Sequence, residues 1–598
     1  MTSIHSDRRP ERHGGSPSPS RRIRSSLAAA LPLLAAACGL APDTSVQAVE
    51  TIYRDVRSWK DELDVTRARG ASRTARGVPL VEVIARYNER RTKLQGALAG
   101  IQVSPRSPED RRALEVMRHT LEETLGEERS SASGGDEAGA SLDCAYDPTR
   151  LAAGANGWKD LSDRMSACFG RASASLSFEG KTLDRLTVLG LLAVTNGAEH
   201  RKRLFLALEP VWRSINGDGG AATSPYRQLV RLNAAALVAG QSSVETRAAE
   251  LGVEPGLVEG WLTTTLDAWR RHAPAESVEP WDFLYRTGQA SRVLGRAIPR
   301  ASLRAINDRY YRDLGADVAT LGIQYDLDPR PGKDPVAFTA LAARPRLADG
   351  TWAPGEPWIF ASYAIGGLDN LGELLHESGH AVHMAAVRTR PAFTDWPDSD
   401  VFTEALADVP ALELYEPAWQ RRYLGVAAPL ADAIRAKYAG IVLDMAWALF
   451  ELRMHRDPAA DPSRVWAEIA ERYLRIRPHP ELAWWAVRSQ LVSAPGYMLS
   501  YAVGAIVAAD LRARVKALHG PFAEGDLGWY AWMSSRLYRF GLERPSRRVL
   551  EDFLGRPVSP RAFLDDLARG QTSSAEGGNV RTAMPDSVSR SGGRRCCA

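Results

Sequence analysis

The sequence predicts a mainly α-helical protein with one small β-sheet. Long Leu- and Ala-rich segments carry charged residues throughout and contain few glycines or prolines, which is typical of helices joined by short connections. Between Gly322 and Tyr363 the pattern changes to short β-prone pieces punctuated by Pro and Gly, so the sheet is expected there. With 598 residues, 44% hydrophobic and 25% charged, the chain is long enough for a large core and is unlike disordered, collagenous or multi-span membrane proteins.

The charge balance gives no reason to expect a nucleic-acid partner. The 76 Lys and Arg residues exceed the 72 Asp and Glu residues by only four over the whole chain. A balance this even does not produce the field that gathers a polyanion. The sequence leaves the oligomeric state open.

The N-terminal segment is typical of a secretory signal, which we place at residues 1–37. Three arginines precede the 13-residue run SSLAAALPLLAAA, which is too short to span a membrane. Small residues directly before Cys38 resemble the lipobox of bacterial lipoproteins. This resemblance implies cleavage before Cys38, lipidation of its thiol and, with Gly39 following, sorting to the outer membrane. A plain cleaved signal and a core helix are the alternatives.

Composition divides the rest of the chain into three parts. Residues 38–142 are expected to form an N-terminal helical region that ends in a flexible linker, ERSSASGGDEAGASL. Residues 143–569 are expected to form the helical body, and residues 570–598 a disordered tail, because the tail has few large apolar residues. Cys144 and Cys168 are either bridged, which stabilises the fold by roughly 3.5 kcal/mol, or two buried free thiols.

The segment NLGELLHESGHAVHMAAV, which begins at Asn370, predicts a helix that carries metal-binding chemistry. Asn370 is expected to cap its start. His376 and His380 lie one turn apart, so both imidazoles project from one face and can share an ion. Glu377 lies beside them and completes HExxH, in which two histidines bind one zinc ion and the glutamate takes a proton from the zinc-activated water.

A third ligand is expected on the next helical pattern, VFTEALADVPALELYE. Glu404 lies 24 residues past His380 and can complete a His2Glu zinc site. Asp408, one turn further on, can accept a hydrogen bond from the free ring nitrogen of His376 or His380. His383 is either a residue that supports the ligands or faces the substrate, or a packed imidazole.

These motifs resemble two groups of helical zinc peptidases known as gluzincins. HESGHAVH at 376–383 is similar to the HExGHxxH helix of the thimet oligopeptidase and oligoendopeptidase family, and DLDPRPGK at 326–333 looks like the strand segment that precedes that helix there. FTEALADV at 402–409 has the third-ligand spacing of the angiotensin-converting enzyme family. The likeness extends weakly over about residues 190–515. It implies a two-lobed, mainly α metallopeptidase with a deep channel that admits short peptides.

A late segment, QLVSAPGYMLSYAVGAIVAADL, supplies two candidate oxyanion donors, Tyr501 and Tyr497. We prefer Tyr501, because it lies well past the Pro-Gly break on a continuing helix. Val492 stands where the oligopeptidase family would have a histidine, and the nearest alternative, His479, lies 13 residues upstream.

The sequence therefore predicts an exported, lipid-anchored zinc metallopeptidase that hydrolyses short peptides. Glu377 is the expected general base, and the lipid at the N-terminus is the expected contact with the membrane. No GxSxG elbow, phosphate-binding loop or Cys–His pair points to another chemistry. The missing late histidine leaves one alternative, a catalytically impaired peptide-binding lipoprotein on the same fold.

Overall fold

The computed structural model describes residues 45–101, 107–134, 144, 157–218, 224–237, 242–273, 275–330, 333 and 336–578. The predicted signal segment and its lipidation site, Cys38, lie outside these residues, as do Cys596 and Cys597. The statements that follow concern the described residues.

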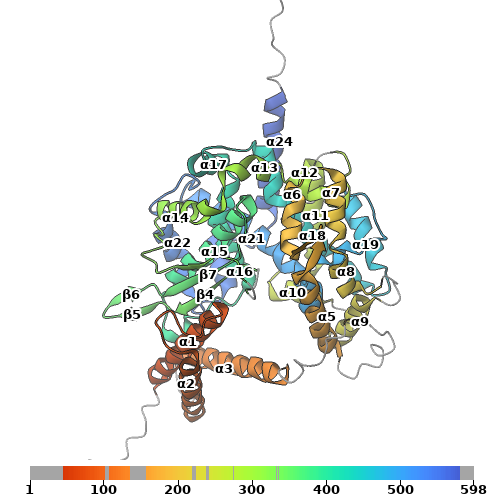
Figure 1. Ribbon diagram of the computed structural model, residues 1–598. Helices are drawn as coiled ribbons and strands as arrows, with labels where there is room; N and C mark the ends of the chain where they lie inside the picture. The colour runs from red at the N-terminus through yellow and green to blue at the C-terminus, as the bar shows by residue number, and fades with distance from the viewer. Residues whose placement is uncertain are drawn as a thin grey trace, which may run out of the picture.

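Three helices form the N-terminal region: α1 (Val46–Ala68), α2 (Leu80–Gly100) and α3 (Pro108–Gly134). Ser45 caps α1 by accepting a hydrogen bond from the backbone N–H of Ala48. The apolar faces of the three helices share a small core of their own, which also takes in Ala392 and Phe393 of the body. The N-terminal region therefore packs onto the body beside the residues that follow α15, and Val65 of α1 also packs against Ala342, Trp358 and Phe360 of the sheet (Figure 1).

A buried ionic cluster strengthens this junction. Asp395 forms ion pairs with Arg57 of α1 and with Arg344, and it accepts a hydrogen bond from the Tyr53 hydroxyl. Arg344 also pairs with Asp61 of α1, with 2.7 Å between Nε and Oδ2. Burial favours the neutral carboxyl, but the two guanidinium groups outweigh it and hold the pKa of Asp395 well below its usual range.

The first half of the body is helical apart from one short hairpin. Its elements are α5 (Gly157–Ala174), β1 (Leu176–Phe178), β2 (Lys181–Leu183), α6 (Arg185–Val194), α7 (Ala198–Leu206), α8 (Glu209–Asn216), α9 (Pro225–Ala236), α10 (Ser243–Glu250), α11 (Pro255–His272), α12 (Phe283–Thr287), α13 (Gln289–Leu294) and α14 (Leu303–Asp313).

The second half of the body begins with the strands and continues as helices. The strands are β3 (Gln324–Asp326), β4 (Phe338–Ala343), β5 (Arg346–Ala348), β6 (Thr351–Ala353) and β7 (Glu356–Phe360). The helices are α15 (Leu368–Ala386), α16 (Asp400–Ala411), α17 (Pro417–Leu424), α18 (Leu430–Arg456), α19 (Pro462–Ile469), α20 (Gln490–Ser493), α21 (Met498–Leu518), α22 (Trp529–Arg536), α23 (Ser546–Leu554) and α24 (Arg561–Gly578).

The predicted sheet lies where the sequence places it, next to the metal-binding helix. Its strand order is β3-β7-β4, with β3 parallel and β4 antiparallel to β7. Strands β5 and β6 form a separate hairpin. Strand β4 is at the edge of its sheet, and its outer edge pairs with no other described strand.

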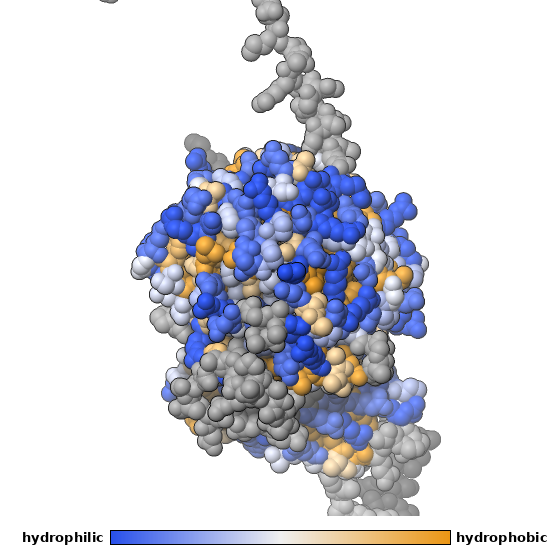
Figure 2. Space-filling model, turned by 90° about the vertical axis from the view of Figure 1, so that its right-hand side faces the viewer, coloured by the Kyte–Doolittle hydropathy of each residue, from blue (hydrophilic) through white to orange (hydrophobic). Residues whose placement is uncertain are grey.

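The helices gather in two groups, as the two-lobed prediction requires (Figure 1). One group surrounds the sheet and α15, and the other surrounds α11 and α18. One hydrophobic core runs through both groups. The face turned toward the viewer in Figure 2 is mainly hydrophilic, with apolar residues in small separate groups. Among the described helices, none is long and apolar enough to cross a membrane.

Two helices extend past positions at which the sequence predicted a linker or a tail, and one hairpin was not predicted. Helix α3 runs to Gly134, into the segment predicted as a linker, and α24 runs to Gly578, nine residues beyond the predicted end of the body at 569. The residue after 569 is Gly570, but no proline follows until Pro585, so no proline stops the helix at 569. The hairpin β1–β2 was not predicted, and its strands of three residues are too short for a periodic signal.

A disulfide joins Cys144 and Cys168, whose Cα atoms lie 5.8 Å apart. Cys168 belongs to α5, and Ser162 of the same helix donates a hydrogen bond to the carbonyl of Val492 at 2.6 Å. The disulfide therefore braces the helix on which α20 rests.

Candidate metal centre

Helix α15 carries the HExxH motif and begins three residues earlier than a cap at Asn370 predicts. Its N-cap is Gly367, at a φ of 110° that a residue with a side chain rarely adopts. Asn370 is the third residue of the helix, and its side chain donates to the carbonyl of Ile365 at 2.9 Å. The predicted cap at Asn370 is therefore wrong, because glycine turns the chain into the helix first.

Helices α15 and α16 pass unusually close to each other at Gly379. A Cβ atom at Gly379 would lie 2.6 Å from the carbonyl oxygen of Ala407 and 2.7 Å from its Cα atom. Only glycine fits this crossing. Gly379, between the two histidines, therefore allows α16 to lie close to α15. This close approach brings Glu404 and Asp408 of α16 next to the motif.

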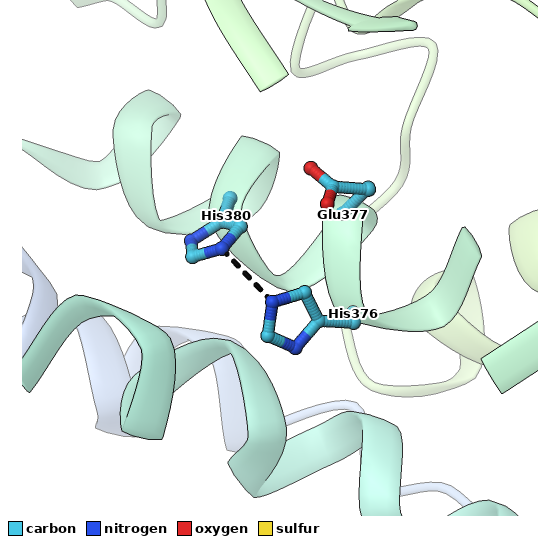
Figure 3. A group of neighbouring side chains, drawn as sticks. All are labelled: His376, Glu377 and His380. Carbon is cyan, nitrogen blue, oxygen red and sulfur yellow. Dashed lines mark hydrogen bonds between the residues drawn. The ribbon is translucent and has the colours of Figure 1, made fainter. Parts of the chain in front are cut away.

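Three potential ligand atoms converge at the crossing. The Nε2 atoms of His376 and His380 lie 3.1 Å apart and point toward each other from adjacent turns of α15 (Figure 3). Glu404 lies opposite, with Oε2 at 3.0 Å from Nε2 of His376 and Oε1 at 3.4 Å from Nε2 of His380. Two imidazoles and one carboxylate are a donor set that zinc uses in catalytic sites.

Asp408 contacts the other nitrogen of His376. Its Oδ1 lies 2.8 Å from Nδ1 of His376; when Nδ1–H donates to this carboxylate, the neutral ring can offer the Nε2 lone pair to a metal ion. Two imidazole nitrogens and a carboxylate oxygen then face one another, an arrangement that a cation stabilises. Burial lowers the pKa of His376, but Asp408 and Glu404 outweigh it and raise that pKa well above its usual value. The residues present therefore fit a divalent metal ion.

Glu377 lies beside the histidine pair and is held by the sheet. A carboxylate oxygen of Glu377 and one ring nitrogen each of His376 and His380 all lie within 4.8 Å of one another. The Thr339 hydroxyl, on β4, donates to Oε2 of Glu377 at 2.7 Å and contacts its backbone carbonyl oxygen at 3.0 Å. Glu404 contacts both imidazole nitrogens directly, whereas Glu377 is bonded to Thr339. We therefore assign Glu404 rather than Glu377 as the candidate third ligand.

His383 is a packed imidazole. It is fully buried between the rings of Trp396 and Tyr538, at centroid distances of 4.7 and 4.9 Å. Burial, with a smaller effect of His380, lowers the pKa of His383 to about 3, so the ring stays neutral. Trp396 also contacts His380, so this aromatic group supports the ligand from behind.

Tyr497 and Tyr501 lie at the start of α21, which packs against α16. Their rings meet edge to face at 5.4 Å. Burial raises the pKa of Tyr497 to about 12, and burial also raises that of Tyr501; the negative charge of Glu404 adds to both shifts. Gln490 donates to the Tyr501 hydroxyl at 3.0 Å, a contact that no sequence motif indicated.

Neither of the two positions considered from the sequence, Val492 and His479, gives this tyrosine pair a histidine partner. Val492 is fully buried, so its side chain is part of the core. His479 has both ring nitrogens bonded to carboxylates, at 2.6 Å to Glu481 and 2.7 Å to Glu279. His479 is therefore engaged elsewhere.

A cavity of about 830 Å³ lies between α1, the hairpin β5–β6 and the residues that follow α15. Several arginines line it, but Arg344 pairs with Asp61 and Arg390 pairs with Glu50. None of the predicted site residues lines this cavity.

Solved structures of peptidases are similar to this chain. PZ peptidase A in complex with an inhibitor matches with a TM-score of 0.50 and 15% identity, over 89% of this chain and 96% of that chain. The M32 carboxypeptidase of Deinococcus radiodurans R1 matches with a TM-score of 0.49 and 15% identity, over 89% of this chain and 98% of that chain. A putative oligoendopeptidase F of Bacillus anthracis matches with a TM-score of 0.49 and 16% identity, over 88% of this chain and 96% of that chain.

The likeness to PZ peptidase A shows a shared fold at a low sequence identity. The sequence resemblance to the oligopeptidases is thus confirmed at the level of the fold. No model of a known protein family matches the sequence, and no curated protein matches it either.

Proposed function

We propose that the protein is a zinc-dependent metallopeptidase that hydrolyses short peptides. One observation carries the proposal: Nε2 of His376, Nε2 of His380 and the carboxylate of Glu404 converge within hydrogen-bond distance, with Asp408 behind His376. The peptidase fold supports the same conclusion independently of these side chains.

The residues around the centre then take distinct roles. Zinc, when bound by His376, His380 and Glu404, supplies a Lewis acid that lowers the pKa of water to about 7. Glu377 takes the proton of the attacking water and returns it to the leaving amine. Thr339 holds the Glu377 carboxylate in place. Tyr501 or Tyr497 donates a hydrogen bond to the oxyanion of the tetrahedral intermediate.

Strand β4 supports a peptide as the substrate. Its outer edge pairs with no described strand, and its Thr339 contacts the proposed general base. An extended peptide that adds to this edge forms main-chain hydrogen bonds irrespective of its sequence. Such a peptide would run past Glu377, where its scissile bond is needed.

The test is hydrolysis of a mixed peptide library by the purified protein, with and without a chelator. We expect cleavage of short peptides that stops on chelation and returns on adding zinc. If the two lobes enclose a channel, as the sequence resemblance implies, intact folded proteins remain uncleaved in the same assay. Peptide binding without any cleavage would instead support the alternative, an impaired peptide-binding protein, which Val492 in place of a histidine favours.

We also propose that the protein is exported and anchored through a lipid on Cys38. The support is the sequence alone: a charged start, a 13-residue apolar run and small residues before the cysteine. Because the run is too short to span a bilayer, Cys38→Ser should release the protein from the membrane fraction. Mass spectrometry that finds no lipid on Cys38 contradicts the proposal.

A further inference from the structure

Glu451 is a fully buried carboxylate in the middle of the long helix α18. Its hydrogen bonds go to the backbone of a segment 45 residues further along the chain. Oε1 accepts from the N–H of Gly496 at 2.8 Å, and Oε2 accepts from the N–H of Met498 at 3.1 Å. These two amides belong to the residues before and after Tyr497, so the two oxygens of one side chain hold the backbone on either side of the tyrosine.

No basic residue forms an ion pair with Glu451 among the described residues. Burying a carboxylate without a cation is costly, unless hydrogen bonds satisfy its oxygens. Its partners here lie at the N-terminus of the 21-residue helix α21, where free N–H groups and the helix dipole favour a negative group. Helix α21 has no side-chain cap of its own, since its N-cap is Tyr497. Glu451 therefore caps α21 from another helix.

The same turn is held from the opposite side by α10. Gly496 has a φ of 88°, and a Cβ atom there would lie 2.6 Å from the carbonyl oxygen of Ser243. The Arg247 guanidinium lies over the Tyr497 ring at 5.2 Å, and its Nε donates to the Ser500 hydroxyl at 2.8 Å. The turn is thus clamped between α10 and α18.

We propose that Glu451 is the positioning residue of the tyrosine pair: it fixes the peptide groups around Tyr497 and, through the edge-to-face contact of the rings, the direction of Tyr501. The inference rests on the proposed function, in which one of these hydroxyls stabilises the oxyanion. Glu451 itself touches no substrate. Its removal leaves the metal ligands in place and moves a donor whose position matters only in the transition state.

The first test is the kinetics of Glu451→Gln, which keeps the size of the side chain but replaces one acceptor oxygen with an amide. We expect kcat to fall about 10- to 100-fold while KM and zinc content stay within twofold of wild type. The same substitution is then made in a Tyr501→Phe background and in a Tyr497→Phe background. In the background that lacks the positioned hydroxyl, Glu451→Gln should lower kcat by no more than a further twofold. Full additivity in both backgrounds overturns the proposal.

Asp510→Asn is the matched control. Asp510 is also a fully buried carboxylate and lies on α21 itself, but it contacts Arg556 and the backbone of Ser559, away from the tyrosines. This variant should lose thermal stability with kcat within twofold of wild type. If Glu451→Gln does not fold, Glu451→Asp, which keeps the carboxyl group but shortens its reach, replaces it in the same cycle.

A second readout does not depend on hydrolysis. A 3-fluorotyrosine introduced at position 497 should give one sharp ¹⁹F resonance in the zinc-loaded protein, and a broadened or split one in Glu451→Gln. If the wild type cleaves no peptide but this change is seen, the proposed function fails while the positioning role stands. If the wild type cleaves peptides and the resonance and kcat are both unchanged in Glu451→Gln, the positioning role fails.

Discussion

The two helices that supply the candidate chemistry, α15 and α21, are organised in opposite ways. On α15 the reactive groups are close in sequence: His376, Glu377 and His380 lie within two turns, and Gly379 lets α16 approach them. At the start of α21 the contacts come from other helices: the Tyr501 hydroxyl accepts a hydrogen bond from Gln490 of α20, and the backbone on either side of Tyr497 is bonded to Glu451 of α18.

This difference separates two tasks of one site. In the proposed mechanism the α15 side binds a cation and transfers a proton, which need charged and basic groups at fixed spacing. The α21 side needs only a neutral donor in the correct direction, which packing and hydrogen bonds to the backbone provide. Substitutions on α15 are therefore expected to affect the metal and the base, and substitutions around α21 only the rate.

The largest effect is expected for Glu377→Gln. The amide cannot accept the proton of the attacking water, so kcat should fall by about 10⁴-fold, the upper end for a general base. Zinc content should not change, since the converging atoms belong to His376, His380 and Glu404. The measurement is metal analysis together with initial rates. Loss of zinc in this variant would mean that Glu377 is a ligand.

Glu404→Ala and Asp408→Ala should affect the metal to different degrees. Without Glu404 one of the three converging groups is missing, so zinc affinity should fall by more than about 100-fold. Asp408 only orients His376, and such a partner typically contributes about 10- to 100-fold in affinity. Competition with a chromogenic chelator measures both. The reverse order of the two losses would exchange the assigned roles.

Tyr501→Phe should change the rate without changing the metal. Oxyanion donors typically contribute about 10²- to 10³-fold, so kcat should fall by that factor while zinc content and Tm stay near wild type. Tyr497→Phe is the matched comparison on the same helix end and should lose less. If Tyr501→Phe is within twofold of wild type and Tyr497→Phe is impaired, Tyr497 is the donor.

The smallest catalytic effect is expected from removing the disulfide. In the double variant Cys144→Ser and Cys168→Ser the unfolding free energy should fall by about 3.5 kcal/mol, from the loop that the bond closes. The bridge braces α5 beneath α20, away from α15, so zinc affinity should not change. Chemical denaturation and metal titration test the two halves of this expectation. A change in zinc affinity would show that the α5–α20 region is coupled to the metal site on α15.

Residues that act through local spacing could be predicted from the sequence. The helix that carries HExxH, though not its first residue, the two histidines and the partnership of Glu404 with Asp408 follow from a period of 3.6 residues. Contacts across large sequence separations could not be predicted. Thr339 reaches Glu377 from a strand 38 residues earlier, and the Glu451 contacts require the packing of α18 on α21. Helix ends at Gly134 and Gly578 were missed because no strong stop signal marks them.

The ion pairs of Asp395 affect the order in which parts of the chain can fold during synthesis. Arg57 of α1 leaves the ribosome 338 residues before Asp395, its partner. At about 5 to 20 residues per second, α1 waits roughly 17 to 70 s before that partner exists. During this time its apolar side chains, such as Val49 and Val56, lack the body residues Ala392 and Phe393 against which their core closes. Helix α1, the first described helix, therefore completes its packing only after residue 395 has been made.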